Sequence, residues 1–292
     1  MEKIADSELI LNPDHSIYHL KLLPHQIAND IIVVGDPQRV NIISSKFDSI
    51  EFKIENREFI THTGFLNGQR ISVLGTGIGT DNIDIVLNEL DALVNIDLAN
   101  RCEKKEKTSL NIVRIGTCGA LQEHINVDDF IVSEYALGLD GLLNFYCHDT
   151  TNEELELLDE FYDQTNYSKQ LAQPYFVKAS SKLHALFAAN CHSGITATAP
   201  GFYGPQGRKL RIELKEPSIN DKLQQFNHHQ LRINNFEMET SAIYGLSKIL
   251  GHHACTVCVV VANRYSKKIS KNYHESIDQL IDLVLLKLTV KG

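Results

Sequence analysis

The sequence predicts an α/β fold with a mixed β-sheet. Short apolar runs alternate along the chain with segments in which apolar residues recur at helical spacing, and this alternation is typical of α/β proteins. The chain has 292 residues, 43% of them hydrophobic and 22% charged, which is ordinary for a globular protein with a substantial core. No repeat, low-complexity linker or shift in composition marks a boundary, so we expect residues 1–292 to form one domain.

The first predicted elements follow from short apolar runs and the turns that separate them. Residues 31–34 are expected to form a strand that runs into Gly35-Asp36-Pro37. Pro37 suits the first turn of a helix that continues to Ile43, because its missing N–H would be unpaired there in any case. Residues 59–63 and 70–74 read as two further strands around a turn at Asn67-Gly68.

Later elements follow the same alternation. A glycine string over residues 75–79 leads into a helix with one apolar face, formed by Ile83, Val86, Leu87, Leu90 and Val94. Further strands are expected over residues 111–115, 130–133, 195–199 and 255–262. A final helix is indicated by the spacing of Ile277, Leu280, Ile281, Val284, Leu285 and Leu288. The acidic and then polar stretch 150–173 gives no clear prediction.

Composition and charge narrow the classes of function. The net charge of −9 argues against a general binder of nucleic acid or of membrane surfaces. We see no secretory signal and no apolar run long enough to span a membrane. Cys255-x-x-Cys258 lies in an apolar run without a second cysteine or histidine pair, so we interpret both as buried strand residues, expect no metal site, and expect a cytoplasmic protein with reduced thiols.

Two strand ends combine small residues with an arginine. In the first, Gly35 ends a strand and Arg39 follows in the first turn of the next helix; free backbone N–H groups at such a position favour an anion. In the second, Arg114 ends a strand and is followed by Gly116 and Thr117. The two turns could bind one phosphate through guanidinium, hydroxyl and amide groups, or they could be ordinary turns with surface arginines.

The segment Phe236-Glu237-Met238-Glu239-Thr240 places two acids beside an apolar helix expected from Ser241 onward, after a polar segment over residues 232–235. Ionised carboxylates can accept hydrogen bonds from neighbouring hydroxyl groups. The alternative is a helix N-terminus with ordinary solvated acids, where Glu237 has no capping role. The glycine string 75–79 does not match the dinucleotide-binding pattern, and no phosphate-loop lysine follows it, so nicotinamide and ATP chemistry are disfavoured.

Six motifs in order resemble those of nucleoside phosphorylases of the uridine phosphorylase type. They are GDPQRV (35–40), GTGIG (75–79), RIGTCGALQEHINVDD (114–129), GFYGPQGR (201–208), FEMET (236–240) and ANR (262–264). The resemblance implies one domain around a distorted mixed sheet and the phosphorolysis of a nucleoside to free base and ribose 1-phosphate. Inorganic phosphate is then the co-substrate and no cofactor is required. It also implies a homodimer as the smallest active unit, with a hexamer of three dimers as an alternative.

The resemblance assigns roles to residues at matching positions. It implies a phosphate site of Gly35, Arg39, Arg114 and Thr117, which Arg57 joins from a neighbouring subunit. It implies a ribose site of Glu237, Met238 and Glu239, with His19 lent across the same interface to the 5′-hydroxyl. It implies a base site of Phe202, Gln206, Arg208 and Arg264. Within these sets we expect the reaction to depend most on Arg39, Arg114, Glu239, Gln206 and Arg208.

The same positions favour a pyrimidine base. Purine-cleaving members of the family usually carry an aspartate in the region where this chain has Ala262-Asn263-Arg264. A glutamine amide can both donate to and accept from the N3 and carbonyl edge of uracil, and a guanidinium can meet charge developing on a carbonyl. Uridine is therefore the expected substrate, with deoxyuridine and thymidine as close alternatives. A purine nucleoside phosphorylase, a nucleosidase and a non-catalytic nucleoside-binding protein are the competing interpretations.

The chain also departs from the family pattern. Cys118 stands where many relatives have threonine or serine, which would alter contacts to the sugar. Asn82 stands where some relatives use a serine to bind a monovalent cation at the subunit interface, so the resemblance gives weak support for that ion although Glu58 is present.

Overall fold

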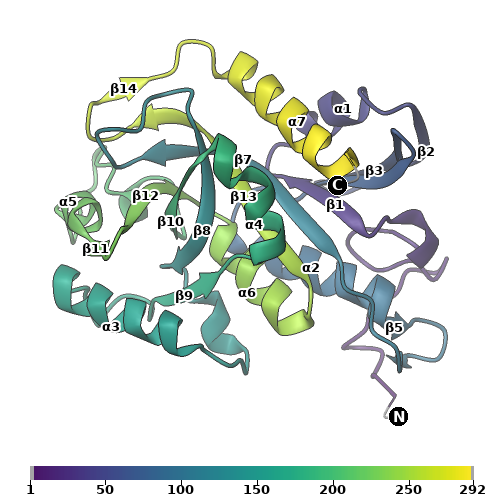
Figure 1. Ribbon diagram of the computed structural model, residues 1–292. Helices are drawn as coiled ribbons and strands as arrows, with labels where there is room; N and C mark the ends of the chain where they lie inside the picture. The colour runs from purple at the N-terminus through teal and green to yellow at the C-terminus, as the bar shows by residue number, and fades with distance from the viewer. Residues whose placement is uncertain (1–2, 291–292) are drawn as a thin grey trace.

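A twisted β-sheet that partly closes on itself organises the computed structural model, which describes residues 3–290 (Figure 1). The helices of this part of the chain are α1 (Gln38–Ser44), α2 (Thr80–Asn95), α3 (Asn152–Thr165), α4 (Ser181–Phe187), α5 (Ile219–Gln225), α6 (Thr240–Leu250) and α7 (Tyr273–Thr289). Short 3-10 turns occur at η1 (Pro24–Gln26), η2 (Leu142–Phe145), η3 (Ala188–Asn190) and η4 (Gly204–Gln206).

The strands fall into one large sheet and one small hairpin. The large sheet contains β1 (Asp30–Val34), β2 (Ser49–Asn56), β3 (Phe59–Leu66), β4 (Gln69–Gly75), β7 (Asn111–Ala120), β8 (Phe130–Gly138), β9 (Tyr175–Lys178), β10 (His192–Thr198), β11 (Asn227–His228), β12 (Leu231–Glu237), β13 (His253–Asn263) and β14 (Lys268–Ile269). The hairpin joins β5 (Ile96–Asp97) and β6 (Cys102–Glu103) in the connection after α2.

Strand order explains why the sheet is distorted. The main path runs β11-β12-β10-β8-β13-β7-β1-β4-β3-β2, and β12 also pairs with β7 through Asn235 and Phe236. Strands β7, β12, β10, β8 and β13 therefore close into a ring. Parallel pairs such as β1 with β4 and antiparallel pairs such as β8 with β13 both occur. The predicted α/β class with a central mixed, distorted sheet flanked by helices is confirmed.

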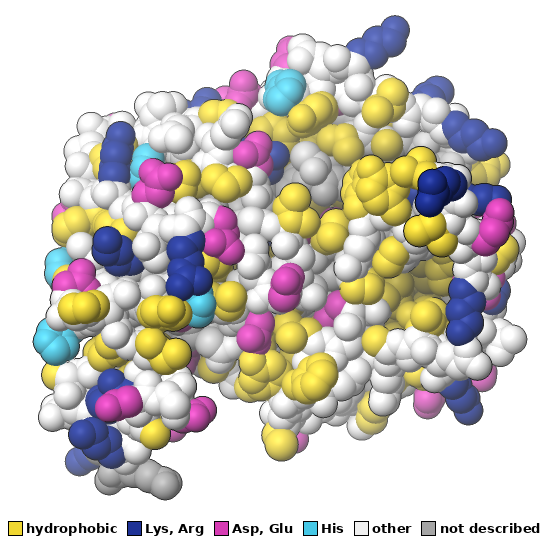
Figure 2. Space-filling view, turned by 180° about the vertical axis from the view of Figure 1, so that it is seen from behind, with side chains coloured by type: hydrophobic (Ala, Val, Ile, Leu, Met, Phe, Trp, Pro, Cys, Tyr) yellow, Lys and Arg dark blue, Asp and Glu magenta, His cyan; other side chains and the backbone are white. Residues whose placement is uncertain are grey.

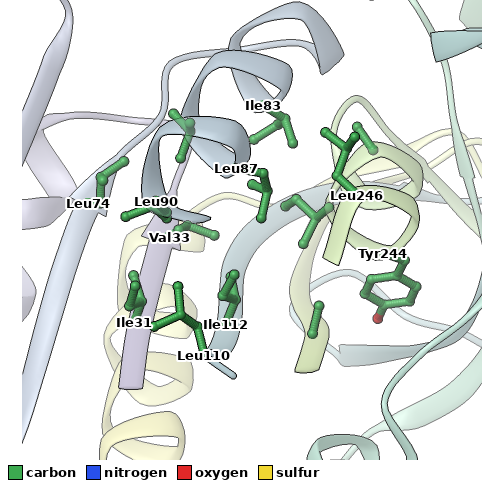
Figure 3. Packing of buried hydrophobic residues seen from close by; sticks show 14 of the residues in the cluster. Ile31, Val33, Leu74, Ile83, Leu87, Leu90, Leu110, Ile112, Tyr244 and Leu246 are labelled. Atoms are coloured by element: carbon green, nitrogen blue, oxygen red, sulfur yellow. The ribbon is translucent and has the colours of Figure 1, made fainter. Parts of the chain in front are cut away.

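Strand β1 is buried on both faces, as expected of a central parallel strand. Ile31 and Val33 face a core shared with α2 and α6, while Ile32 and Val34 face a second core shared with α1, α4 and α7. Figure 3 shows the first core, where Leu87 of α2 lies among strand and α6 side chains. Helices thus cover both faces of the sheet (Figure 1), and this arrangement leaves the carboxyl ends of the strands free to build a site.

The stretch that gave no clear prediction contains α3 and the loop behind it. Thr151 accepts a hydrogen bond from the Glu154 N–H at 3.3 Å, and the Glu154 side chain accepts one from the Thr151 N–H at 2.9 Å, which is a capping box. Leu157 and Phe161 then pack into a third core with α5.

Several predicted strand boundaries are wrong, and the strand expected over 130–133 continues to Gly138. The strand expected over 111–115 continues to Ala120, because Gly116 to Ala120 pair with β13. The polar segment 232–235 belongs to β12, and Asn234 and Asn235 in it are buried. The turn at Asn67-Gly68 and the final helix are confirmed.

Cys255 and Cys258 are buried on β13, as predicted, and the six cysteines are free thiols. Among the helices of the described residues, none combines the length and the apolar character needed to cross a membrane.

Candidate active site

A cavity of about 580 Å³ lies where β1, β7, β12 and β13 end. Gly35 follows β1, Thr117 and Cys118 lie on β7, and Ala262 lies on β13. Most of the predicted site residues line this one cavity. They are Gly35, Arg39, Arg114, Thr117, Phe202, Gln206, Arg208, Glu237, Met238, Glu239 and Arg264. The fold thus brings together side chains that are up to 229 positions apart, from Gly35 to Arg264.

Arg114 is the most deeply embedded cation of the cavity. Its guanidinium pairs with Glu239, lies 3.3 Å from Glu237 Oε2 and donates to Cys258 Sγ at 3.2 Å. Burial alone would lower the pKa of Arg114, but the two carboxylates outweigh burial and raise its pKa above the ordinary value. The side chain has room because residue 116 is a glycine: a Cβ there would lie 2.0 Å from Arg114 Nη1.

Glu239 connects this cation to the glycine string that ends β4. One carboxylate oxygen accepts the Gly79 N–H at 2.8 Å, and the other meets Arg114. Gly79 adopts φ = 101°, a conformation that side chains disfavour, just before α2 begins. Burial raises the pKa of Glu239; Arg114 opposes this effect and the nearby Glu237 adds to it. Two acids therefore share one guanidinium.

Glu237 holds the start of α6. Its carboxylate accepts the N–H groups of Glu239 at 3.0 Å and of Thr240 at 2.9 Å, and the Thr198 hydroxyl at 2.6 Å. The helix starts at Thr240 rather than Ser241, and the expectation that Glu237 has no capping role is wrong. The alternative of two solvated acids is also wrong, because Glu237 and Glu239 are only 4% and 3% exposed.

Arg39 is the second cation of the cavity and lies in the first turn of α1. It is buried and donates to the Ile115 carbonyl at 3.4 Å. Burial lowers its pKa, the Asp36 carboxylate opposes this effect, and the charge of Arg114 adds to it. Thr117 and the Gly35 backbone line the same end of the cavity. This end therefore gathers two guanidinium groups, a hydroxyl and backbone amides, a set suited to a tetrahedral oxyanion.

The other end of the cavity is formed by the segment that precedes and follows η4. Gln206 is buried, and its Oε1 accepts a hydrogen bond from Arg208 Nη1 at 2.5 Å. The Arg208 guanidinium also lies over the Phe202 ring, 3.7 Å from the ring centre, and donates to the Phe202 carbonyl at 2.6 Å. Burial, with the neighbouring charge of Arg264, lowers the pKa of Arg208 to about 10. Arg208 fixes the Gln206 carbonyl oxygen and leaves the amide NH₂ to donate.

Arg264 completes this end. The Asn220 side chain of α5 links it to Gln206. In the orientation that satisfies both ends of its amide, Asn220 donates to the Gln206 backbone carbonyl at 3.2 Å and accepts a hydrogen bond from Arg264 Nη2 at 3.1 Å. Arg264 Nη1 is buried and has no hydrogen-bond partner within residues 3–290. The neighbouring Asn263 is committed elsewhere, because its amide donates to the carbonyls of Gln122 and Ile125 at 2.9 and 2.7 Å.

Three apolar side chains at the edge of the cavity are exposed. Phe202 is half exposed, and Ile78 and Ile269 are more exposed than Phe202. A second cavity of about 770 Å³ adjoins the first behind Arg208 and is lined by apolar residues that include Leu210 and Ile212. Figure 2 shows hydrophobic side chains gathered around a hollow on the face turned away from the viewer in Figure 1.

His19 and Arg57 do not line the cavity of their own chain. The His19 ring pairs with Glu89 at 2.7 Å, and Arg57 donates to the Tyr18 hydroxyl at 3.0 Å. Arg57 lies at the β2–β3 turn, with φ = 55°. The fold therefore places the two residues near one another, through the adjacent Tyr18, and outside the cavity that the other eleven positions line.

Sequence reasoning missed several groups that hold the site. The glycine string 75–79 was compared with a dinucleotide pattern and matched as a family motif, but Gly79 was given no role of its own, yet its N–H donates to Glu239. Cys258 was identified as a core residue, yet its sulfur accepts from Arg114. Thr198 and Asn220 carry no local signal, because their roles depend on contacts with residues far away in the sequence.

Comparisons with known proteins agree with this geometry. A model of the phosphorylase superfamily matches residues 30–287. A uridine phosphorylase of Thermococcus kodakarensis is 30% identical over 277 residues, which cover 93% of this chain and 86% of the relative. A purine nucleoside phosphorylase of the DeoD type from Buchnera aphidicola is 27% identical over 271 residues, covering 92% and 95%.

Among solved structures, a Trypanosoma brucei nucleoside phosphorylase described as showing uridine phosphorylase activity superposes with a TM-score of 0.88. The two chains are 31% identical, and the match covers 96% of this chain and 99% of the other.

Proposed function

The chain belongs to the phosphorylase superfamily, and from that premise we propose that it cleaves uridine with inorganic phosphate to give uracil and ribose 1-phosphate. The proposal rests on three groups that line one cavity: the anion site of Arg39 and Arg114, the buried carboxylate of Glu239, and the Gln206–Arg208 pair. Similarity to a uridine phosphorylase and to a structure described as having that activity supports it.

Arg39, Arg114, Thr117 and the Gly35 backbone bind the phosphate. Cleavage of the glycosidic bond builds positive charge on the sugar, and a phosphate oxygen held beneath C1′ stabilises that charge and then forms the new bond. Because Arg114 already faces Glu239 and Glu237, phosphate and ribose sites share one guanidinium. Phosphate binding and sugar orientation are coupled through it.

Glu239 accepts hydrogen bonds from the 2′- and 3′-hydroxyl groups of ribose, and Met238 packs beneath the sugar. Gly79 and Arg114 fix the carboxylate before substrate arrives, so little reorganisation is needed on binding. Glu237 supports this arrangement through the backbone amides at the start of α6 rather than through a contact with the sugar.

The departing uracil is held by Gln206, Arg208 and Arg264, with Phe202 packing on the ring. The Gln206 NH₂ donates to a base carbonyl, and the unpartnered Arg264 Nη1 supplies a second donor for charge that develops on the base. No acid is required to protonate the leaving group on this account. Asn263, at the end of β13 next to Arg264, donates its amide to the carbonyls of Gln122 and Ile125 and is not free to meet the base, which disfavours the purine alternative.

The smallest active unit is a homodimer in which His19 and Arg57 complete the partner's site, and a hexamer of three dimers is the larger alternative. Both residues lie together outside their own cavity, which supports this sharing. Inorganic phosphate serves as co-substrate and no cofactor takes part. Glu58 and Asn82 give no support for a monovalent cation beyond the family resemblance.

A substrate panel tests the proposal. Uridine, deoxyuridine, thymidine and inosine are each incubated with and without phosphate, and free base is quantified. The expected result is release of uracil from uridine only with phosphate, and little release of hypoxanthine from inosine. Preferential cleavage of inosine would favour the purine alternative, and binding without any turnover would favour a nucleoside-binding protein.

A further inference from the structure

Three side chains outside the cavity form a cluster with metal-binding groups. Glu156, His228 and His229 each offer a ligand atom, and these atoms all lie within 4.8 Å of one another. His228 Nε2 and Glu156 Oε1 lie 3.8 Å apart. The set is separate from the residues that line the cavity described above.

Backbone geometry explains how neighbouring histidines come to share a direction. Successive side chains of a strand point to opposite faces, and His228 is the last residue of β11. His229 opens the two-residue turn to β12 and adopts φ = 54°, a left-handed conformation. That conformation turns its ring toward His228, and the two ring centres are 4.3 Å apart. Non-glycine residues are uncommon in this region, and histidine is among those that are enriched there.

Helix α3 supplies the third group at a fixed position. The β11 strand is attached to α3 by two hydrogen bonds between Gln164 and the backbone of Asn227, at 2.9 and 3.0 Å. Figure 1 shows β11 beside the same helix. The His228 side chain is 10% exposed and that of Glu156 is 62% exposed. The His228 ring is therefore held in place, whereas the Glu156 carboxylate is free to move toward a metal ion.

We propose that Glu156, His228 and His229 bind one Zn²⁺ ion and that the ion clasps α3 to the β11–β12 hairpin. Two imidazoles and one carboxylate match the ligands of zinc and other late transition metals, whereas Mg²⁺ and Ca²⁺ prefer all-oxygen sites. Tetrahedral zinc with bonds of about 2.0–2.1 Å places its ligand atoms about 3.3 Å apart. The observed spacing closes to this value through rotation of the two exposed side chains, Glu156 and His229. The fourth position is taken by water.

The nearby Glu153 is not a fourth ligand in this arrangement, because its carboxylate pairs with Lys178 at 2.9 Å. Strand β12 leads from the clasp to Glu237, and the clasp therefore stabilises the element that enters the active site without contacting substrate.

Calorimetric titration of chelator-treated, untagged protein with Zn²⁺ tests the site. The expected result is one equivalent bound, with a higher melting temperature in zinc than in chelator. His228→Gln, His229→Gln and Glu156→Gln should each weaken binding at least about tenfold. His25→Gln serves as the matched control, since His25 is exposed and lies outside the cluster; its affinity should match that of the unaltered protein.

Substitution by Co²⁺ separates this site from the free cysteines. Cobalt bound by nitrogen and oxygen ligands absorbs in the visible range without the near-ultraviolet bands of thiolate coordination. If a histidine variant fails to fold, the Glu156→Gln variant still tests the site, because it leaves the β11–β12 hairpin unaltered. No zinc binding by the unaltered protein, thiolate bands in the cobalt spectrum, or unchanged affinity in Glu156→Gln and in a His228→Gln/His229→Gln double variant would each overturn the proposal.

Discussion

Replacement of Glu239 by glutamine is the most informative perturbation of the ribose site. In the native arrangement one carboxylate oxygen accepts the Gly79 N–H at 2.8 Å and the other pairs with Arg114. Glutamine has nearly the same size and keeps one acceptor oxygen. It removes the charge, however, and turns the second oxygen into an NH₂ donor that faces either a guanidinium or a sugar hydroxyl.

The magnitude follows from the hydrogen bonds that are lost. A bond to a charged group contributes about 1.5–3 kcal/mol. The two ribose hydroxyls share one carboxylate, so the second bond contributes less than the first, and together they stabilise the transition state by about 2–4 kcal/mol. At 1.36 kcal/mol per factor of ten, their loss lowers kcat/KM by about 30- to 1,000-fold. Breaking a buried ion pair typically lowers the free energy of unfolding by about 3–5 kcal/mol. Here we expect a smaller loss of about 1–3 kcal/mol, because Glu237 remains 3.3 Å from Arg114.

The assay is kcat/KM for uridine at saturating phosphate, with thermal unfolding measured in parallel. Glu154→Gln is the matched control: Glu154 is also buried and pairs with Lys248 at 2.7 Å, but it does not line the active cavity. This control should lose stability and keep its activity per folded molecule. A Glu239→Gln enzyme whose kcat/KM stays within threefold of the unaltered value would refute the ribose assignment.

Four further outcomes follow from the site. Gln206→Ala should lower kcat/KM for uridine by about a hundredfold or more but cost only about 1 kcal/mol of stability, measured by turnover and unfolding; near-normal turnover would remove Gln206 from the base site. Gly116→Ala should weaken phosphate binding, read as phosphate KM, because a Cβ would meet Arg114 Nη1 at 2.0 Å; an unchanged KM with an intact fold would contradict this packing. Mixed inactive Arg57→Ala and Glu239→Ala subunits should recover activity if sites are shared, and no recovery after verified subunit exchange would count against sharing. In the unaltered enzyme, uridine binding should weaken as pH falls through a midpoint above the ordinary glutamate value of about 4.3, because burial raises the pKa of Glu239 and protonation removes its charge; a midpoint at or below that value would contradict the assignment.

Local patterns were enough to predict the fold class. Periodicity identified α2 and α7, and the apolar run 31–34 identified β1, because these elements bury their side chains in a regular way. The α3 segment was missed although Thr151 and Glu154 form a capping box. Its apolar face is narrow and lies among many acids, so periodicity alone gave a weak signal.

The site was predicted less completely, because burial and pairing depend on tertiary contacts. The acids at 237 and 239 have equal chemistry in the sequence, yet Glu237 caps α6 and Glu239 faces Arg114 and Gly79. The continuation of β7 to Ala120 was missed because glycine and small residues end most strands, whereas here β13 pairs with them. The position of Arg57 outside the cavity could be expected only from the family resemblance.

The dependence of uracil release on phosphate separates phosphorolysis from hydrolysis. Uridine is incubated with the enzyme in phosphate buffer and in a phosphate-free buffer of equal ionic strength, and products are followed by ³¹P NMR together with uracil absorbance. The account predicts that uracil and ribose 1-phosphate appear in equal amounts with phosphate, and that uracil release nearly stops without it. Equal rates of uracil release in both buffers, with free ribose as the sugar product, would contradict it.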